Sequence, residues 1–99
     1  MKILSVIVSG SSMLPTFAPG EVVHVNVSQL GVGVGVGDVA LYRKYRTHLT
    51  LHRVIEIVEE GDELRYITKG DGNPTNDEYS VVGSELLGVV ETSSGRGER

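Results

Sequence analysis

The sequence predicts an all-β fold built as one small domain. Apolar residues recur at every second position in several stretches, as in "EVVHVNV" at residues 21–27, where Val23, Val25 and Val27 share one face. These stretches are rich in β-branched residues, and alternation with that composition is typical of strands. No stretch has the spacing of a convincing amphipathic helix, and residues 13–17 predict one helical turn at most.

We expect strands separated by glycine-rich and polar turns. They are predicted at residues 2–8, 21–27, 38–43, 48–60, 63–68 and 86–91. The segment "EEGDE" predicts a hairpin between the strands at 48–60 and 63–68, because Gly-Asp is a favoured two-residue loop. The repetitive "GVGVGVG" at residues 31–37 predicts a flexible connection or a weak edge strand, since glycine offers a strand nothing to pack.

Length and composition narrow the function classes. The 99 residues suit one domain, which we expect at residues 1–92, with the polar segment "SSGRGER" at 93–99 as a disordered tail. The chain has no cysteine, so it has neither a disulfide framework nor a thiolate metal site. A net charge of −4 argues against a nucleic-acid partner, and the basic cluster Arg43, Lys44 and Arg46 predicts a solvated loop.

The apolar segment "KILSVIV" at residues 2–8 is too short for a membrane span and lacks the pattern of a signal peptide. We therefore expect the chain, as given, to be soluble.

Few side chains in the sequence are able to perform nucleophilic or acid–base chemistry. The candidates are the serines Ser9, Ser11 and Ser12, the histidines His24, His48 and His52, and the aspartates Asp71 and Asp77. A serine hydroxyl becomes a nucleophile when a base removes its proton and a third group orients that base. His52 lies mid-strand among apolar residues, whereas His24 is expected on a strand surface and His48 at a solvated loop end. From the residue types alone the signal for a catalytic triad is weak, and a structural histidine and ordinary turn aspartates remain open readings.

Several blocks in order resemble a known family. They are "SGSSMLPTFAPGEVVHVN", "GDVALYR", "THLTLHRVIEIV", "YITKGDGNPTNDEYSVV" and "LLGVV", and together they span residues 8–90. This order resembles the type I signal peptidases, and in particular their archaeal, endoplasmic-reticulum and sporulation-type branch. That branch uses serine and histidine, whereas the ordinary bacterial branch uses serine and lysine.

The resemblance implies a role for each matching residue. Ser12, directly before Met13, takes the position of the nucleophile, and His52 takes that of the general base. In the "KGD…D" block Asp77 best matches the acid of the triad, and Asp71 matches a second acidic position. The chain has one more serine before Met13 than family members often have, so the supporting hydroxyl of the oxyanion hole is Ser11, Ser9 or neither. The backbone N–H of Ser12 is the other expected donor.

The same resemblance implies a signal-peptidase fold of coiled antiparallel sheets or a partial barrel. It implies a serine endopeptidase that cuts preproteins after small residues of the Ala-x-Ala type, without metal or cofactor. The preprotein or peptide would bind in extended form, and apolar residues such as Leu14, Phe17, Val22 and Val23 would form shallow pockets, face lipid or belong to the core. Family members usually carry a membrane anchor before the serine block, so the full-length protein is expected at a membrane surface with an extracytoplasmic catalytic domain.

Three alternatives remain beside this reading. One is a soluble maturation protease, and another is a self-cleaving, repressor-like relative, although those relatives resemble the lysine branch and His52 counts against them. The third is an inactive, peptide-binding β-domain.

Overall fold

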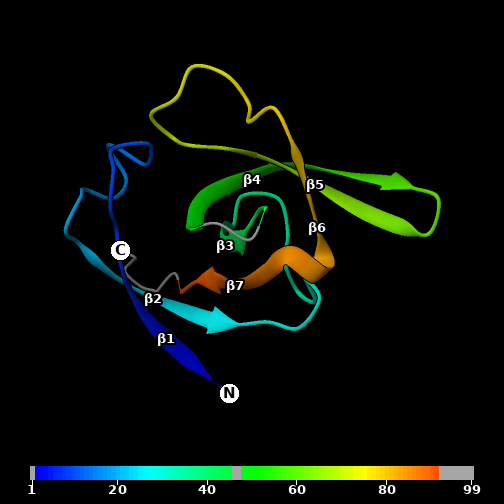
Figure 1. Ribbon diagram of the computed structural model, residues 1–99, viewed down its shortest axis with the longest axis horizontal. Helices are drawn as coiled ribbons and strands as arrows, with labels where there is room; N and C mark the ends of the chain where they lie inside the picture. Colours follow the sequence, from blue (N-terminus) through cyan, green and yellow to red (C-terminus); the bar gives the residue numbers. More distant parts are fainter. Residues whose placement is uncertain (1, 46–47, 92–99) are drawn as a thin grey trace.

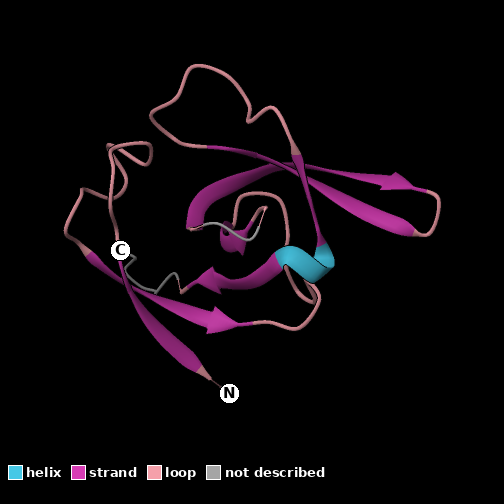
Figure 2. Ribbon diagram, in the orientation of Figure 1, coloured by secondary structure: helices cyan, strands magenta, loops and turns pink. Residues whose placement is uncertain are grey.

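Seven antiparallel strands form one continuous sheet in the order β1-β2-β7-β3-β4-β5-β6 in the computed structural model, which describes residues 2–45 and 48–91 (Figure 1). The elements are β1 (Ile3–Ile7), β2 (Val22–Val27), β3 (Val39–Arg43), β4 (Leu49–Glu60), β5 (Glu63–Lys69), β6 (Ser80–Val82), the 3₁₀ helix η1 (Gly83–Glu85) and β7 (Leu86–Val90). Figure 2 shows that strands and loops dominate, with η1 as the one helical element of the described residues. The predicted all-β class is confirmed.

The predicted strands all form, and no strand end differs from its predicted position by more than one residue. The hairpin prediction is confirmed as well, because Glu60 pairs with Glu63 across a two-residue loop. β6 was not predicted, since three residues are too few to display an alternating pattern. Residues 31–37 form turns and connect β2 to β3. The predicted tail at 93–99 and Arg46 lie outside the described residues.

The sheet is coiled but open. β1 pairs only with β2, and β6 pairs only with β5 among the described residues, so the two ends of the sheet are not joined. β4 bends strongly as it passes from β3 to β5 (Figure 1). This arrangement matches the expected partial barrel.

A β-bulge in β4 decides which of its side chains are buried. The register with β5 shifts between Val54 and Glu56, so Ile55 is an extra residue in the strand. Before the bulge, His52 and Val54 are buried, and after it Ile57 packs against the same apolar cluster as Val54. The bulge therefore lets β4 keep one face on the core although its apolar residues do not alternate regularly along the strand.

Two apolar clusters fill the fold and flank the candidate site. One contains Val8, Met13, Val23, Val25, Val39, Leu41 and Val90. The other contains Val34, Ala40, Tyr42, Val54, Tyr66, Val81 and Leu86. The first cluster lies under the loop that carries Ser12, because Met13 belongs to it, and the second lies beside His52, because Val54 is two residues further along the same face of β4.

We expect Gly88 in β7 to be essential for joining the two halves of the sheet. A Cβ at this position would lie 2.3 Å from the backbone oxygen of Asn26 and 2.6 Å from a methyl group of Val25. Gly88→Ala should lower the free energy of unfolding by roughly 1–3 kcal/mol, as overpacking does. Gly35→Ala is the matched control, since a Cβ there would meet only a side-chain oxygen of Asp38 at 3.9 Å. Equal stability of the two variants in chemical denaturation would contradict this prediction.

Candidate active site

Ser12 lies on the loop that joins β1 to β2. Two backbone hydrogen bonds close the base of this loop, from the Val8 N–H to the Glu21 carbonyl and from the Gly20 N–H to the Val8 carbonyl. Next to Ser12, the Met13 side chain is 2% exposed and anchors the loop in the first apolar cluster. The loop is therefore fixed at its base and at its tip, as presentation of a reacting side chain requires.

The turn after β5 packs directly against the Ser12 loop. The Gly72 N–H donates a 2.8 Å hydrogen bond to the Ser12 carbonyl. A Cβ at Gly70 would lie 2.6 Å from that carbonyl oxygen and 3.0 Å from the Ser12 Cβ. The two backbones approach this closely because glycine has no side chain, and the approach fixes the position of Ser12 relative to the sheet.

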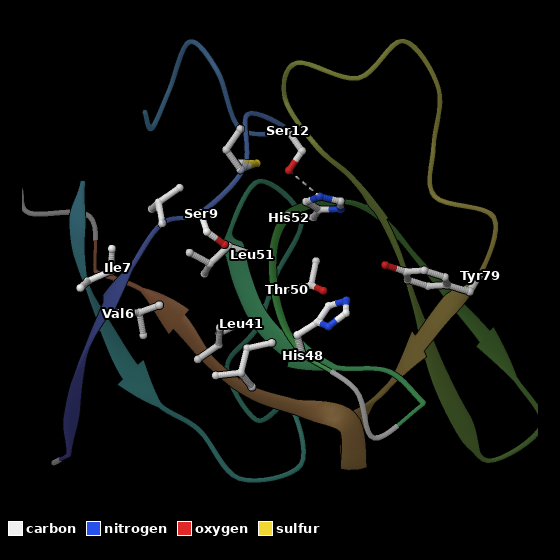
Figure 3. Close-up of a pocket in the computed structure, with 13 residues that line it drawn as sticks. Val6, Ile7, Ser9, Ser12, Leu41, His48, Thr50, Leu51, His52 and Tyr79 are labelled. Atoms are coloured by element: carbon white, nitrogen blue, oxygen red, sulfur yellow. Dashed lines mark hydrogen bonds between the residues drawn. The ribbon is translucent and has the colours of Figure 1, made fainter. Parts of the chain in front are cut away.

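His52 joins Ser12 to Asp77 in a continuous hydrogen-bonded chain. Its Nε2 atom lies 3.0 Å from the Ser12 Oγ, drawn as a dashed line in Figure 3. Its Nδ1 atom lies 2.7 Å from the Asp77 Oδ2. The His52 residue is 8% exposed, so both ring nitrogens find their partners away from bulk water. A carboxylate at Nδ1 favours the tautomer that leaves Nε2 free to accept a proton from the serine hydroxyl.

Two further hydroxyl groups hold Asp77. Its Oδ2 atom accepts a 2.7 Å hydrogen bond from the Thr68 Oγ1 and a 3.2 Å hydrogen bond from the Tyr42 hydroxyl. Its N–H also donates to the Thr68 carbonyl at 2.8 Å. Thr68 and Tyr42 are not among the residues predicted for the site. A hydroxyl on the core face of a strand is nevertheless a usable signal, because buried polar groups need partners.

Asp71, the second candidate carboxylate, faces different partners. Its two oxygens accept hydrogen bonds from Arg53 Nε at 2.9 Å and Arg53 Nη2 at 2.7 Å, and Thr16 Oγ1 also donates to it. The Arg53 guanidinium holds the pKa of the Asp71 carboxyl below its usual value. Asp71 thus links β4 to the Ser12 loop and is not bonded to His52, which pairs with Asp77 instead.

The remaining predicted residues lie in varied places. Ser9 lines the cleft in front of Ser12, whereas Ser11 is exposed and its carbonyl accepts the Leu14 N–H. His24 is on β2, where its Nδ1 lies 3.3 Å from the Ser5 Oγ. His48 is exposed as expected, yet it also lines the cleft, which the sequence analysis did not anticipate.

A cleft of about 550 Å³ opens beside Ser12 and His52. Its lining residues are Val6, Ile7, Val8, Ser9, Ser12, Met13, Leu41, His48, Leu49, Thr50, Leu51, His52 and Tyr79. Figure 3 shows Val6 and Ile7 across the cleft from Tyr79, so one side is apolar and the other carries polar groups.

The predicted pocket residues Leu14, Phe17, Val22 and Val23 do not line this cleft. Val23 is buried and Phe17 packs against the first apolar cluster, so for these two the core alternative is correct. Leu14 and Val22 are exposed elsewhere, because proximity to Ser12 in the sequence does not direct a loop side chain into the cleft.

Comparison with known proteins adds an independent observation to this geometry. Signal peptidase I W of Bacillus subtilis (strain 168) is 32% identical to the chain over 78 residues, which cover 79% of the chain. The chain is similar to a signal peptidase. It spans 40% of the length of this curated relative. No protein-family model matches the chain.

The described ranges, 2–45 and 48–91, contain neither a metal-binding cluster nor a membrane-spanning helix. Nowhere in them do three histidine or acidic side chains lie close enough together to hold a metal ion. They also contain no helix with the length and apolar character needed to cross a membrane.

The stability of the protein should depend on pH through Asp71. Because its folded pKa is lowered, the ion pair with Arg53 contributes fully above the unfolded pKa of about 3.9 and is lost as the pH falls through the folded value. Asp71→Asn should therefore cost roughly 1–2 kcal/mol of unfolding free energy at neutral pH. The difference from wild type should close below about pH 4, as measured by denaturation across the pH range.

Asp62→Asn, in the exposed turn between β4 and β5, is the matched control and should track wild type at every pH. A deficit of Asp71→Asn that persists in acid would contradict the role of the ion pair.

Proposed function

We propose that the protein is a serine endopeptidase of the signal-peptidase type, with Ser12 as nucleophile, His52 as general base and Asp77 as the carboxylate that orients His52. The observation that carries this proposal is the chain of two hydrogen bonds, 3.0 Å from Ser12 to His52 and 2.7 Å from His52 to Asp77. Similarity to signal peptidase I W supports the choice of enzyme class. A histidine in the base position supports the serine–histidine branch of the family.

The mechanism follows from the positions of these atoms. The Ser12 hydroxyl attacks a peptide carbonyl while the His52 Nε2 accepts its proton. The Asp77 carboxylate holds the Nδ1–H and stabilises the imidazolium that forms. The imidazolium then protonates the leaving amine, and a water molecule, activated by the same nitrogen, hydrolyses the acyl-enzyme. In this scheme the low exposure of His52 strengthens its attraction to Asp77, because little water screens the pair.

The tetrahedral intermediate needs donors for its oxyanion. We assign the first donor to the backbone N–H of Ser12, because the attacked carbonyl must lie next to the Ser12 Oγ. Between the two candidate hydroxyls, the proposal favours Ser9, since it lines the cleft and Ser11 does not.

The substrate is proposed to bind as an extended strand beside Ser12. Within residues 2–45 and 48–91, the part of β4 from Leu49 to His52 pairs with β3 on one side only, because its pairing with β5 begins at Arg53. β1 likewise pairs with β2 alone among the described residues. Both strands contribute residues to the cleft, so a peptide between them has free backbone groups to bond. Ala-x-Ala sequences, with two small side chains on one face, are the proposed substrates.

In the full-length protein we propose that this domain works at a membrane surface on the extracytoplasmic side, where preproteins emerge. The chain itself contains every residue assigned to the chemistry.

The first test is cleavage of a preprotein that carries an Ala-x-Ala site, in detergent or with lipid vesicles. Wild type should cut after the second alanine, and Ser12→Ala should lose activity by roughly 1,000-fold or more, since no other group replaces the nucleophile. Ser11→Ala, one residue away and outside the cleft, is the matched control and should retain most activity. Binding without cleavage by folded wild type would instead favour the peptide-binding alternative.

The second test separates the two aspartates. Asp77→Asn should lower kcat by roughly 10³–10⁴-fold, because the amide no longer selects the required tautomer of the base. Asp71→Asn should have a far smaller effect on kcat, since its partners are Arg53 and Thr16. Circular dichroism must show that both variants remain folded. Equal losses, or the reverse order, would overturn the assignment of Asp77.

A further inference from the structure

The Asp77 carboxylate has an unusual concentration of donors on one oxygen. Its Oδ2 lies 2.7 Å from the His52 Nδ1, 2.7 Å from the Thr68 Oγ1 and 3.2 Å from the Tyr42 hydroxyl. These donors come from three neighbouring strands, β4, β5 and β3. Strand register puts these donors on one face of the sheet. Ala40 pairs with His52, and Tyr42 lies two residues after Ala40 on the same face of β3. Val54, two residues after His52, pairs with Thr68. The three strands therefore form a carboxylate-binding site, made by His52, Thr68 and Tyr42, which we call the carboxylate site.

Tyr42 connects the carboxylate site to the cleft through Tyr79. Its side chain is 0% exposed, and burial raises the pKa of its phenol, so the group stays neutral with one proton to donate. Its oxygen also lies 2.8 Å from the Tyr79 hydroxyl. When Tyr42 donates to Asp77, Tyr79 is left to donate to Tyr42, and the hydroxyls form a chain with a single direction.

Ring contacts hold Tyr79 at the outer end of this chain. Its ring meets that of Tyr42 edge-on at 6.1 Å and that of Tyr45 at 6.3 Å, and the Lys44 Nζ lies 5.4 Å from its centre. Tyr79 also lines the cleft beside Ser12 (Figure 3). The chain of hydroxyls thus runs from the cleft wall to the carboxylate behind His52.

We propose that Tyr42 is a positioning residue that fixes Asp77 and moderates the negative charge it presents to His52, with Tyr79 as the group that orients the Tyr42 hydroxyl. A hydrogen bond donated to a carboxylate stabilises and spreads its charge. Removal of the Tyr42 hydroxyl therefore leaves a stronger charge at Nδ1, which favours protonated His52. It also leaves the carboxylate less firmly oriented. The effect on rate rests on the proposed function, whereas the effect on the titration of His52 does not.

The effect of the Tyr42 hydroxyl on the titration of His52 can be separated from the effects of the other titratable groups around it. Asp77 and the Tyr42 hydroxyl lie next to the His52 Nδ1, and the other titratable groups that line the cleft with His52 are Tyr79 and His48. Arg53 and Lys69 are charged residues next to the site, and they are paired across β4 and β5. Both alternate with the core-facing residues of their strands, so they lie on the opposite face of the sheet from His52. Arg53 is also bonded to Asp71. Tyr42→Phe leaves all of these in place, so a change in the titration of His52 reports the lost hydroxyl.

The test is an NMR titration of the histidine ring resonances in wild type and Tyr42→Phe. His24, which lies on β2 and does not line the cleft, is the internal reference. The titration midpoint of His52 should rise by roughly half a pH unit in the variant, because a donor to its carboxylate is gone. With the Ala-x-Ala preprotein, kcat should fall by about tenfold with little change in KM, and the acid limb of the pH profile should move upward with the NMR midpoint.

Tyr66→Phe is the matched control, since Tyr66 is a buried tyrosine of the same apolar cluster outside the network. It should leave the titration and kcat unchanged. Tyr79→Phe should shift His52 in the same direction as Tyr42→Phe but less, and adding it to Tyr42→Phe should have no further effect, because the two hydroxyls act in series.

The outcomes separate this inference from the proposed function. An unchanged His52 midpoint in Tyr42→Phe, with only a lower melting temperature, would make the hydroxyl merely structural and overturn the inference. Absence of cleavage by folded wild type would overturn the proposed function, and the NMR titration would still decide the role of Tyr42. If Tyr42→Phe does not fold, the titration of Tyr79→Phe decides, with no shift counting against the inference.

Discussion

The hydrogen bond between His52 and Asp77 is the interaction on which the rest of the site depends. A nearly buried imidazole must have partners for both nitrogens, and the carboxylate at Nδ1 leaves Nε2 directed at Ser12. The carboxylate in turn is buried at a cost that only its donors offset. The bond between His52 and Asp77 therefore depends on Thr68, on Tyr42 and on the backbone hydrogen bond of Asp77. This dependence explains why polar side chains lie on an otherwise apolar face of the sheet.

The fold supplies this arrangement through separate structural devices. The bulge in β4 keeps Ile57 on the core face that His52 and Val54 share, and β5 passes alongside to bring Thr68 and the loop with Asp77. The glycines of the turn after β5 admit the Ser12 loop against the sheet, while Arg53, Asp71 and Thr16 tie the same two segments together. Close backbone packing and polar side-chain bonds therefore hold the Ser12 loop against the sheet at the same place.

Much of this was predictable from the sequence, for definite physical reasons. Period-two alternation identified the long strands, and the Gly-Asp loop identified the hairpin, because both signals are local. The positions of Ser12, His52 and Asp77 came from their resemblance to a family, since residue types alone left other readings open. Of the readings left open for Leu14, Phe17, Val22 and Val23, the pocket reading is wrong, and the roles of Tyr42 and Thr68 were missed. Both depend on how distant strands align, and a hydroxyl on the core face of a strand signals only that a partner is needed, not which one.

The sequence separation of the three groups has a consequence for when the protein becomes competent. Ser12 and His52 are 40 residues apart, and His52 and Asp77 are a further 25 apart, so every bond of the site closes a long loop. During synthesis Ser12, the proposed nucleophile, leaves the ribosome first and Asp77, the proposed orienting carboxylate, last. Under the proposed mechanism a nascent or partly unfolded chain has the serine hydroxyl without its base in place, so completion of the fold is the step that would make the site active.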